Sequence, residues 1–310
     1  MQFVFVIGAP FCGSTAVGNM LNTHPNIFHA GEVDRLKIFA RYRDHDQHLT
    51  VNGCNLCESH HPRHNCPIWS DYPHIDTHNA HELVRAYKIL TSKSNKNVIL
   101  DTSKNADWLA WLWQNGLQPC SAIVLSRNPF AFAYSHFKAT GQPIWQGIEA
   151  WRNIYNHCLR VFLNRGIPLI SVKHSDLLEN PKHFFDSILM YLHLNGSIDY
   201  NNFSKYPCHA LGGNVGAFVS YPEFQSEVYI KKEIQEKRFP TEEEISSKSS
   251  MSANPMKRTD HQWLKHIPCD EISAAISIPG VVDTMTLLGY DPILIYQQKI
   301  EWQKDNLKTT

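Results

Sequence analysis

The sequence has no excess of charge of either sign. Its 310 residues contain 29 Lys and Arg against 29 Asp and Glu, so the formal net charge is zero. A protein that attracts nucleic acid or an anionic membrane surface through its overall field needs an excess of positive charge. We therefore expect no nucleic-acid partner.

Long hydrophobic runs are also absent. No uninterrupted apolar stretch reaches the roughly 20 residues that a membrane-spanning helix needs. The apolar start has no basic region and is broken by Gly8, Pro10 and Gly13, which argues against a signal peptide. Eight cysteines in a chain of this length do not indicate a disulfide framework. We therefore expect no membrane span, a cytoplasmic location and mostly reduced thiols.

The first residues predict a strand, a phosphate-binding turn and a helix. Residues 2–7 (QFVFVI) are typical of a buried strand, and the glycines of residues 8–15 (GAPFCGST) are spaced as in a phosphate loop. Such a loop directs backbone N–H groups and the positive end of a helix dipole toward an anion. The lysine of nucleoside-triphosphate loops is missing, because Ser14 stands at its position. This favours a nucleotide bound through a single 5′-phosphate; a turn without a ligand is the alternative.

Further strands are predicted at residues 98–100, 122–125 and 169–172, with helices between them. This alternation predicts an α/β fold, with a P-loop NTPase-like central parallel sheet flanked by helices. We expect residues 27–32 to cross the top of the sheet and a short helix at 33–40. Helical segments are expected around Trp263 and at 271–288.

We expect residues 1–310 to form a single domain with two additions. Residues 45–73 are polar and rich in cysteine and histidine, which indicates an insertion. Residues 231–258 are charged and serine-rich, which indicates a mobile surface loop; a lid over the site is the alternative.

A second anion site is predicted beside the loop. In parallel α/β sheets, ligands bind beyond the carboxyl ends of the strands, and this rule brings residues 8–15, 101–105 and 126–128 to one edge. Arg127 at one strand end and Ser135 in the following helix supply a guanidinium and a hydroxyl suited to phosphate. An arginine that only caps the strand end is the alternative.

These residues resemble a known family. Residues 8–15, with Arg127 and Ser135, resemble the two cofactor motifs of sulfotransferases that use 3′-phosphoadenosine 5′-phosphosulfate (PAPS). The similarity runs over most of the chain, is strongest before residue 140, and includes residues 24–27, 31–32 and 101–104. Residues 263–268 look like a segment of tyrosylprotein sulfotransferases, and the cysteine insertion and residues 212–214 look like the bacterial branch.

The resemblance implies roles for individual residues. Arg127 and Ser135 would hold the 3′-phosphate of PAPS, Glu32 would be the general base, and Lys104 would be a catalytic lysine. Glu32 could equally be a solvated or salt-bridged glutamate, with Arg35 as its partner, and Lys104 an exposed lysine. The residues that would hold the 5′-phosphate are Pro10, Phe11, Cys12, Gly13, Ser14, Thr15 and Ala16.

One position departs from the family pattern. The loop of this family usually carries arginine or lysine directly after its proline, and this sequence has Phe11 there. The change removes a cation from the 5′-phosphosulfate and makes Lys104 more important. It allows a slower enzyme, a different arrangement of charge, or a protein that binds the nucleotide without turnover.

The insertion contains a candidate metal site. Cys54, Cys57 and Cys66, with His61 and two further histidines between the last two cysteines, could form a tetrahedral structural zinc site. A disulfide or free thiols are the alternatives.

The resemblance therefore implies a PAPS-dependent sulfotransferase. The reaction would be in-line transfer of a sulfuryl group to an acceptor hydroxyl, with a carboxylate as the base. The acceptor would be a sugar, a small metabolite or a peptide. Two alternatives remain: a catalytically silent nucleotide-binding protein, and a P-loop kinase whose acidic strand end, Asp101, would hold a metal.

Overall fold

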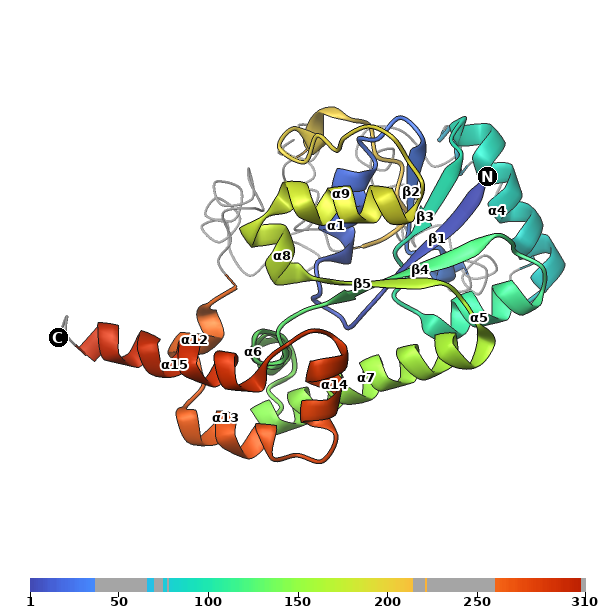
Figure 1. Ribbon diagram of the computed structural model, residues 1–310. Coiled ribbons are helices and arrows are strands. Elements are labelled where there is room, and N and C mark those ends of the chain that lie inside the picture. The colour runs from blue at the N-terminus through green and yellow to red at the C-terminus, as the bar shows by residue number, and fades with distance from the viewer. Residues whose placement is uncertain (37–65, 70–74, 77, 214–220, 222–259, 308–310) are drawn as a thin grey trace, which may run out of the picture.

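A five-stranded parallel sheet forms the centre of the molecule (Figure 1). The computed structural model describes residues 1–36, 66–69, 75–76, 78–213, 221 and 260–307. The strands have the order β2-β3-β1-β4-β5 and are parallel throughout, which confirms the predicted α/β fold. Their bounds are β1 (Gln2–Ile7), β2 (Ile27–Gly31), β3 (Val98–Asp101), β4 (Cys120–Ser126) and β5 (Leu169–Lys173).

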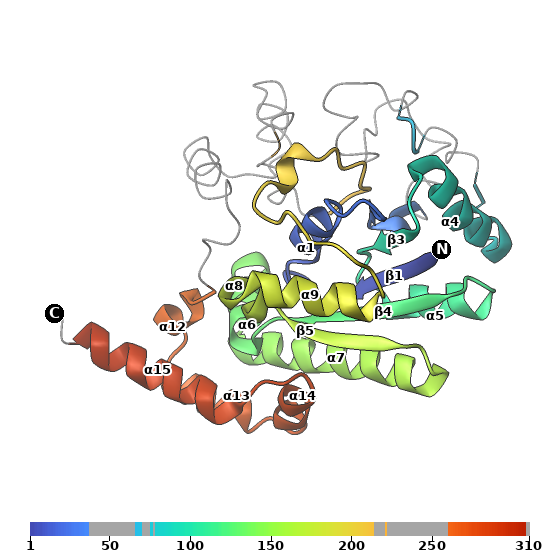
Figure 2. The ribbon, with the colours of Figure 1, turned by 45° about the horizontal axis from the view of Figure 1, so that its top comes forward.

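Both faces of the sheet are covered by helices (Figures 1 and 2). Phe3, Phe5 and Ile7 of β1 belong to the hydrophobic cluster that includes helices α4 to α7, whereas Val4 and Val6 belong to the cluster that includes α1 and α9. This two-sided burial explains why β1 is apolar at every position but its first. The helices are α1 (Ser14–Leu21), α4 (Ala80–Ser94), α5 (Ala106–Gln114), α6 (Pro129–Thr140), α7 (Ile144–Arg165), α8 (His174–Glu179) and α9 (Pro181–Tyr191).

The C-terminal helices pack beside α6 and α7 (Figure 1). Trp263 is buried and stacks on Phe130 of α6, with ring centroids 5.6 Å apart. Lys299 is also buried, and its Nζ donates a hydrogen bond to the backbone carbonyl of Leu264. These helices are α12 (Gln262–His266), α13 (Cys269–Ile276), α14 (Val281–Leu287) and α15 (Pro292–Leu307).

The segment at residues 27–32 differs from the prediction. Residues 27–31 do not cross the top of the sheet but form its edge strand β2, which pairs with β3. His29 in this strand is fully buried, and its ring nitrogens lie 3.0 Å from Asn19 Oδ1 and from Thr102 Oγ1. Burial lowers the pKa of His29 to about 3, so the buried ring is neutral at pH 7. A histidine with both ring nitrogens hydrogen-bonded therefore occupies a core position, although the sequence shows a polar residue there.

Two further helices were not predicted, and one expected helix is only partly described. α8 has only six residues, and α15 carries exposed apolar residues, Ile293 and Leu294, beside the buried Ile295. The expected helix at 33–40 begins as a 3₁₀ turn, η1 (Val33–Arg35), and residues 37–40 lie outside the described residues. The expected mobile loop at 231–258 and nearly all of the expected insertion at 45–73 also lie outside them. Within the described chain, no helix is both long and apolar enough to cross a bilayer.

Candidate active site

The loop between β1 and α1 is shaped by close backbone contacts. A Cβ atom on Gly8 would lie 2.4 Å from the carbonyl oxygen of Leu125 in β4, so only glycine fits there. Gly13, directly before α1, has a φ of 90°, and Phe11 has a φ of 64°. The loop therefore turns sharply and α1 begins at Ser14, as the sequence predicts.

The underside of the loop is fixed by buried side chains. The Tyr155 hydroxyl of α7 accepts a hydrogen bond from the N–H of Ala9 (3.2 Å) and donates one to the carbonyl of Leu125 (2.8 Å). Cys12 is fully buried, and burial raises the pKa of its thiol. Cys12 therefore packs into the core, and its backbone N–H donates a hydrogen bond to the carbonyl of Ala9 (3.2 Å).

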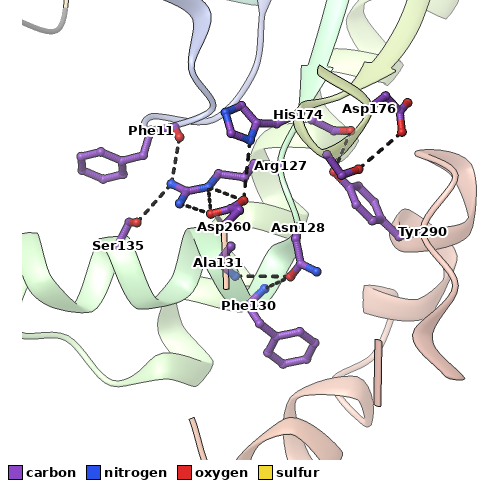
Figure 3. A network of polar contacts seen from close by, with 12 residues as sticks. Phe11, Arg127, Asn128, Phe130, Ala131, Ser135, His174, Asp176, Asp260 and Tyr290 are labelled. Atoms are coloured by element: carbon purple, nitrogen blue, oxygen red, sulfur yellow. Dashed lines mark hydrogen bonds and ion pairs between the residues drawn. The ribbon is translucent and has the colours of Figure 1, made fainter. Parts of the chain in front are cut away.

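Arg127 connects the loop to α6 (Figure 3). Its Nη1 donates to the carbonyl of Phe11 (3.0 Å) and to the Ser135 hydroxyl (3.1 Å). Asn128 begins α6, because its Oδ1 accepts hydrogen bonds from the amides of residues 130 and 131, and Pro129 occupies the first turn as predicted. The two predicted phosphate-binding elements are thus adjacent, and a cation reaches the loop at the residue where the family's cation is missing.

Two residues of this site were not predicted from the sequence. Asp260 accepts hydrogen bonds from Nε of Arg127 at 3.1 and 3.0 Å and another from Nη2 (Figure 3). His174 at the beginning of α8 covers the loop, since a Cβ on Gly13 would lie 2.8 Å from its ring. Burial acts to raise the pKa of Asp260, but His174 and Arg127 outweigh it and the pKa is lowered.

The signals for these two residues differ. His174 directly follows β5, so the strand-end rule could have found it. Asp260 is 133 residues from Arg127 and carries no local motif.

Glu32 and Lys104 form an ion pair at the ends of β2 and β3. Nζ of Lys104 donates to Oε1 of Glu32 (2.5 Å) and to the carbonyl of Thr102 (3.1 Å). Arg35 pairs with the other carboxylate oxygen of Glu32. The glutamate is therefore salt-bridged, as one alternative held, and its two partners are both cations.

The turn that carries Lys104 is held by a buried carboxylate. Asp101 is fully buried and accepts hydrogen bonds from the Tyr87 and Ser103 hydroxyls, from the Ser103 N–H (2.7 Å) and from Trp108 Nε1 (3.3 Å). Burial raises the pKa of Asp101 to about 7, against the hydrogen bonds from Ser103 and Tyr87, which lower it. Because its oxygens are engaged inside the protein, Asp101 is poorly placed to serve as the metal-binding strand end of a kinase.

The predicted zinc site is only partly described. Cys54, Cys57 and His61 lie outside the described residues, whereas Cys66 is buried with its Sγ 3.7 Å from Nδ1 of His209. In the described ranges, no group of three or more His, Cys, Asp or Glu side chains is arranged to hold a metal ion. The zinc site remains a prediction.

A family profile decides the broader identity. The profile described as the sulfotransferase family matches residues 3–197, which is more than half of the chain. The chain belongs to the sulfotransferase family. Membership implies PAPS as the sulfuryl donor. A comparison with curated proteins found no match.

Three solved sulfotransferase structures are among those similar to this chain. The sulfotransferase domain of the Synechococcus PCC 7002 olefin synthase is 14% identical, with 94% of this chain and 95% of that chain covered and a TM-score of 0.50. The sulfotransferase domain from the curacin biosynthetic pathway is 14% identical (81% and 97% covered, TM-score 0.48). A sulfotransferase from Alicyclobacillus acidocaldarius is 16% identical (64% and 83% covered, TM-score 0.37). At 14% identity, the likeness to the olefin synthase domain bears on the fold alone.

Proposed function

We propose that this protein transfers a sulfuryl group from PAPS to a hydroxyl group of an acceptor. The observation that carries the proposal is the pair of hydrogen bonds from Arg127 to the carbonyl of Phe11 and to the hydroxyl of Ser135. They bring a guanidinium and a hydroxyl next to a loop that precedes a helix, so one nucleotide can reach both. Family membership supports the same donor.

The donor set fits a nucleotide with phosphates at two positions. The loop of residues 10–16 offers the amides at the beginning of α1, which have no acceptor within the helix, and the positive end of its dipole. In the proposal this loop holds the 5′-phosphate. Arg127 and Ser135 hold the 3′-phosphate through a guanidinium and a hydroxyl donor.

Lys104 and Glu32 divide the chemistry of transfer between them. The sulfur–oxygen bond to the 5′-phosphate breaks with its electron pair left on that oxygen, and a new sulfur–oxygen bond forms to the acceptor. Lys104 stabilises the charge on the leaving oxygen, and Glu32 accepts the proton of the acceptor hydroxyl. Their ion pair keeps both side chains at the same place.

The acceptor is proposed only as a class. A hydroxyl on a sugar, a small metabolite or a peptide suits a carboxylate base, and no described residue pattern selects among them. The single domain over residues 1–310 likewise remains part of the proposal.

Calorimetry tests which nucleotide the protein binds. Adenosine 3′,5′-bisphosphate and ATP are titrated into the protein, each with and without Mg²⁺. We expect the bisphosphate to bind without Mg²⁺ and more tightly than ATP, because the loop has no lysine for the β- and γ-phosphates. Tighter binding of ATP that depends on Mg²⁺ would favour a kinase instead.

A silent nucleotide-binding protein is the second candidate. Phe11 favours it, since this apolar side chain is 42% exposed where the family pattern has a cation. Transfer of labelled sulfuryl from PAPS to a panel of hydroxyl acceptors separates the two candidates. Product formation supports the enzyme, and nucleotide binding without any product supports the silent protein.

A further inference from the structure

All three nitrogens of the Arg127 guanidinium donate hydrogen bonds within the protein. Nη1 is engaged by Phe11 and Ser135, while Nε and Nη2 are both engaged by the carboxylate of Asp260 (Figure 3). This side-on pairing is the geometry in which arginine binds a carboxylate or a phosphate with two parallel hydrogen bonds. Asp260 thus occupies an edge of Arg127 that a phosphate would use.

The pair is shielded from water. The side chains of Arg127 and Asp260 are 17% and 15% exposed, and Nδ1 of His174 lies 3.7 Å from Oδ2 of Asp260. Partial burial strengthens the attraction between the two charges relative to an ion pair in water. It also strengthens the repulsion between Asp260 and any second anion brought to Arg127.

We infer that Asp260 is a specificity-determining residue that competes with the 3′-phosphate of the nucleotide for Arg127. A 3′-phosphate can bind Arg127 fully only when Asp260 gives up one or both of its hydrogen bonds. Asp260 therefore weakens the binding of nucleotides that carry a 3′-phosphate and leaves 5′-monophosphates unaffected. The inference rests on the proposed function, because it takes Arg127 as the site of the second phosphate.

The test compares two nucleotides on matched variants. Dissociation constants of adenosine 3′,5′-bisphosphate and adenosine 5′-monophosphate are measured for the wild type, Asp260→Asn, Arg127→Ala and the double variant. Asp186→Asn is the control, because Asp186 is an exposed carboxylate that pairs with Lys182 within α9. Circular dichroism checks that each variant is folded.

We expect Asp260→Asn to bind the bisphosphate at least about fivefold more tightly, the lower end of typical coupling between two groups at one site. The monophosphate constant and both constants of Asp186→Asn stay unchanged. With Arg127→Ala present, the second substitution has no further effect, because the shared partner is gone.

Other outcomes overturn the inference in distinguishable ways. Equal or weaker bisphosphate binding by Asp260→Asn means that Asp260 is a bystander or orients Arg127, and contradicts the inference alone. Failure of the wild type and of every variant to bind the bisphosphate contradicts the proposed function, and the inference with it.

Discussion

Lys104 is held in a conformation that lysine rarely adopts. Its φ is 63°, in the left-handed region, where a residue other than glycine is strained by about 1–3 kcal/mol. Hydrogen bonds from Nζ to Glu32 and to the carbonyl of Thr102 hold its side chain toward the end of β2. Strain of this kind is concentrated at functional sites, which agrees with the role proposed for this lysine.

Lys104→Ala tests that role. We expect sulfuryl transfer to fall by at least about 100-fold, because the charge on the leaving oxygen loses its cation. The affinity for adenosine 3′,5′-bisphosphate stays within about twofold, since the phosphate contacts belong to other residues. Initial rates and calorimetry measure the two effects, and Lys88→Ala, an exposed lysine of α4, is the control. An active Lys104→Ala enzyme would refute the assignment.

Asp101 gives a pH dependence of known sign. Its pKa is raised from 3.8 to about 7 in the folded protein, so between these values the folded state keeps a proton that the unfolded chain releases. Raising the pH through this range therefore lowers the free energy of unfolding, by at most about 1.4 kcal/mol per pH unit.

We expect Asp101→Asn to remove this contribution. Urea unfolding of wild type and variant from pH 4 to pH 8 measures it: the stability of the wild type should decline relative to the variant until about pH 7. Asp186→Asn, at an exposed site, should run parallel to the wild type. If the stability of Asp101→Asn followed that of the wild type in parallel from pH 4 to pH 8, the raised pKa of Asp101 would be contradicted.

At the scale of single residues, the sequence predicts the phosphate-binding side chains better than the side chains that pair with them. Arg127 and Ser135 are eight residues apart on a strand end and the helix after it, so local pattern brings them together. Asp260 meets Arg127, and Glu32 meets Lys104, only through the tertiary fold, and nothing local signals those two pairs. The local partner of Glu32, Arg35 three residues on, is the one that the sequence suggests. Glu32 meets Lys104 because β2 lies beside β3. The sequence pattern predicts β3 but does not reveal β2 as a strand.

Among the elements, the unit of β1, loop and α1 is tightly constrained at Gly13. Gly13 and Gly116 have the same φ of 90°, but a Cβ on Gly13 would lie 2.8 Å from the His174 ring, whereas one on Gly116 would meet nothing within 4 Å. Comparing substitutions at the two glycines therefore distinguishes the cost of backbone strain from the cost of steric crowding.

We expect Gly116→Ala to lower the free energy of unfolding by about 1–2 kcal/mol through strain alone. Gly13→Ala should lower it by a further ~1–3 kcal/mol, because the new methyl group meets His174. Denaturant unfolding measures both variants, and adding His174→Ala should recover part of the difference. Equal effects of the two alanine substitutions would show that the ring does not pack on the loop.

The same unit shows which elements a sequence can predict. β1 and α1 are consecutive and each has a clear pattern, so both were predicted with their loop. β2 is an edge strand with a buried histidine, His29, whose ring is hydrogen-bonded to Asn19 and Thr102. Because histidine is polar, the sequence pattern does not show that this position belongs to the core. α15 was missed because apolar residues lie on both its exposed and its buried sides.

For the whole molecule, the strand order explains how the site is divided. β1 is central, with β4 and Arg127 on one side and β3 and Lys104 on the other. The loop after β1 therefore lies between Arg127, the proposed 3′-phosphate contact, and Lys104, which is proposed to act in sulfuryl transfer. This arrangement suits a nucleotide whose reacting group points from the loop toward β3.

The central claim is that one nucleotide spans the loop and Arg127. A crystal structure with adenosine 3′,5′-bisphosphate soaked in tests it most directly. We predict one phosphate on the amides at the beginning of α1 and the other within hydrogen-bond distance of Arg127 and Ser135. A nucleotide bound elsewhere, with neither phosphate at these two positions, would contradict the account.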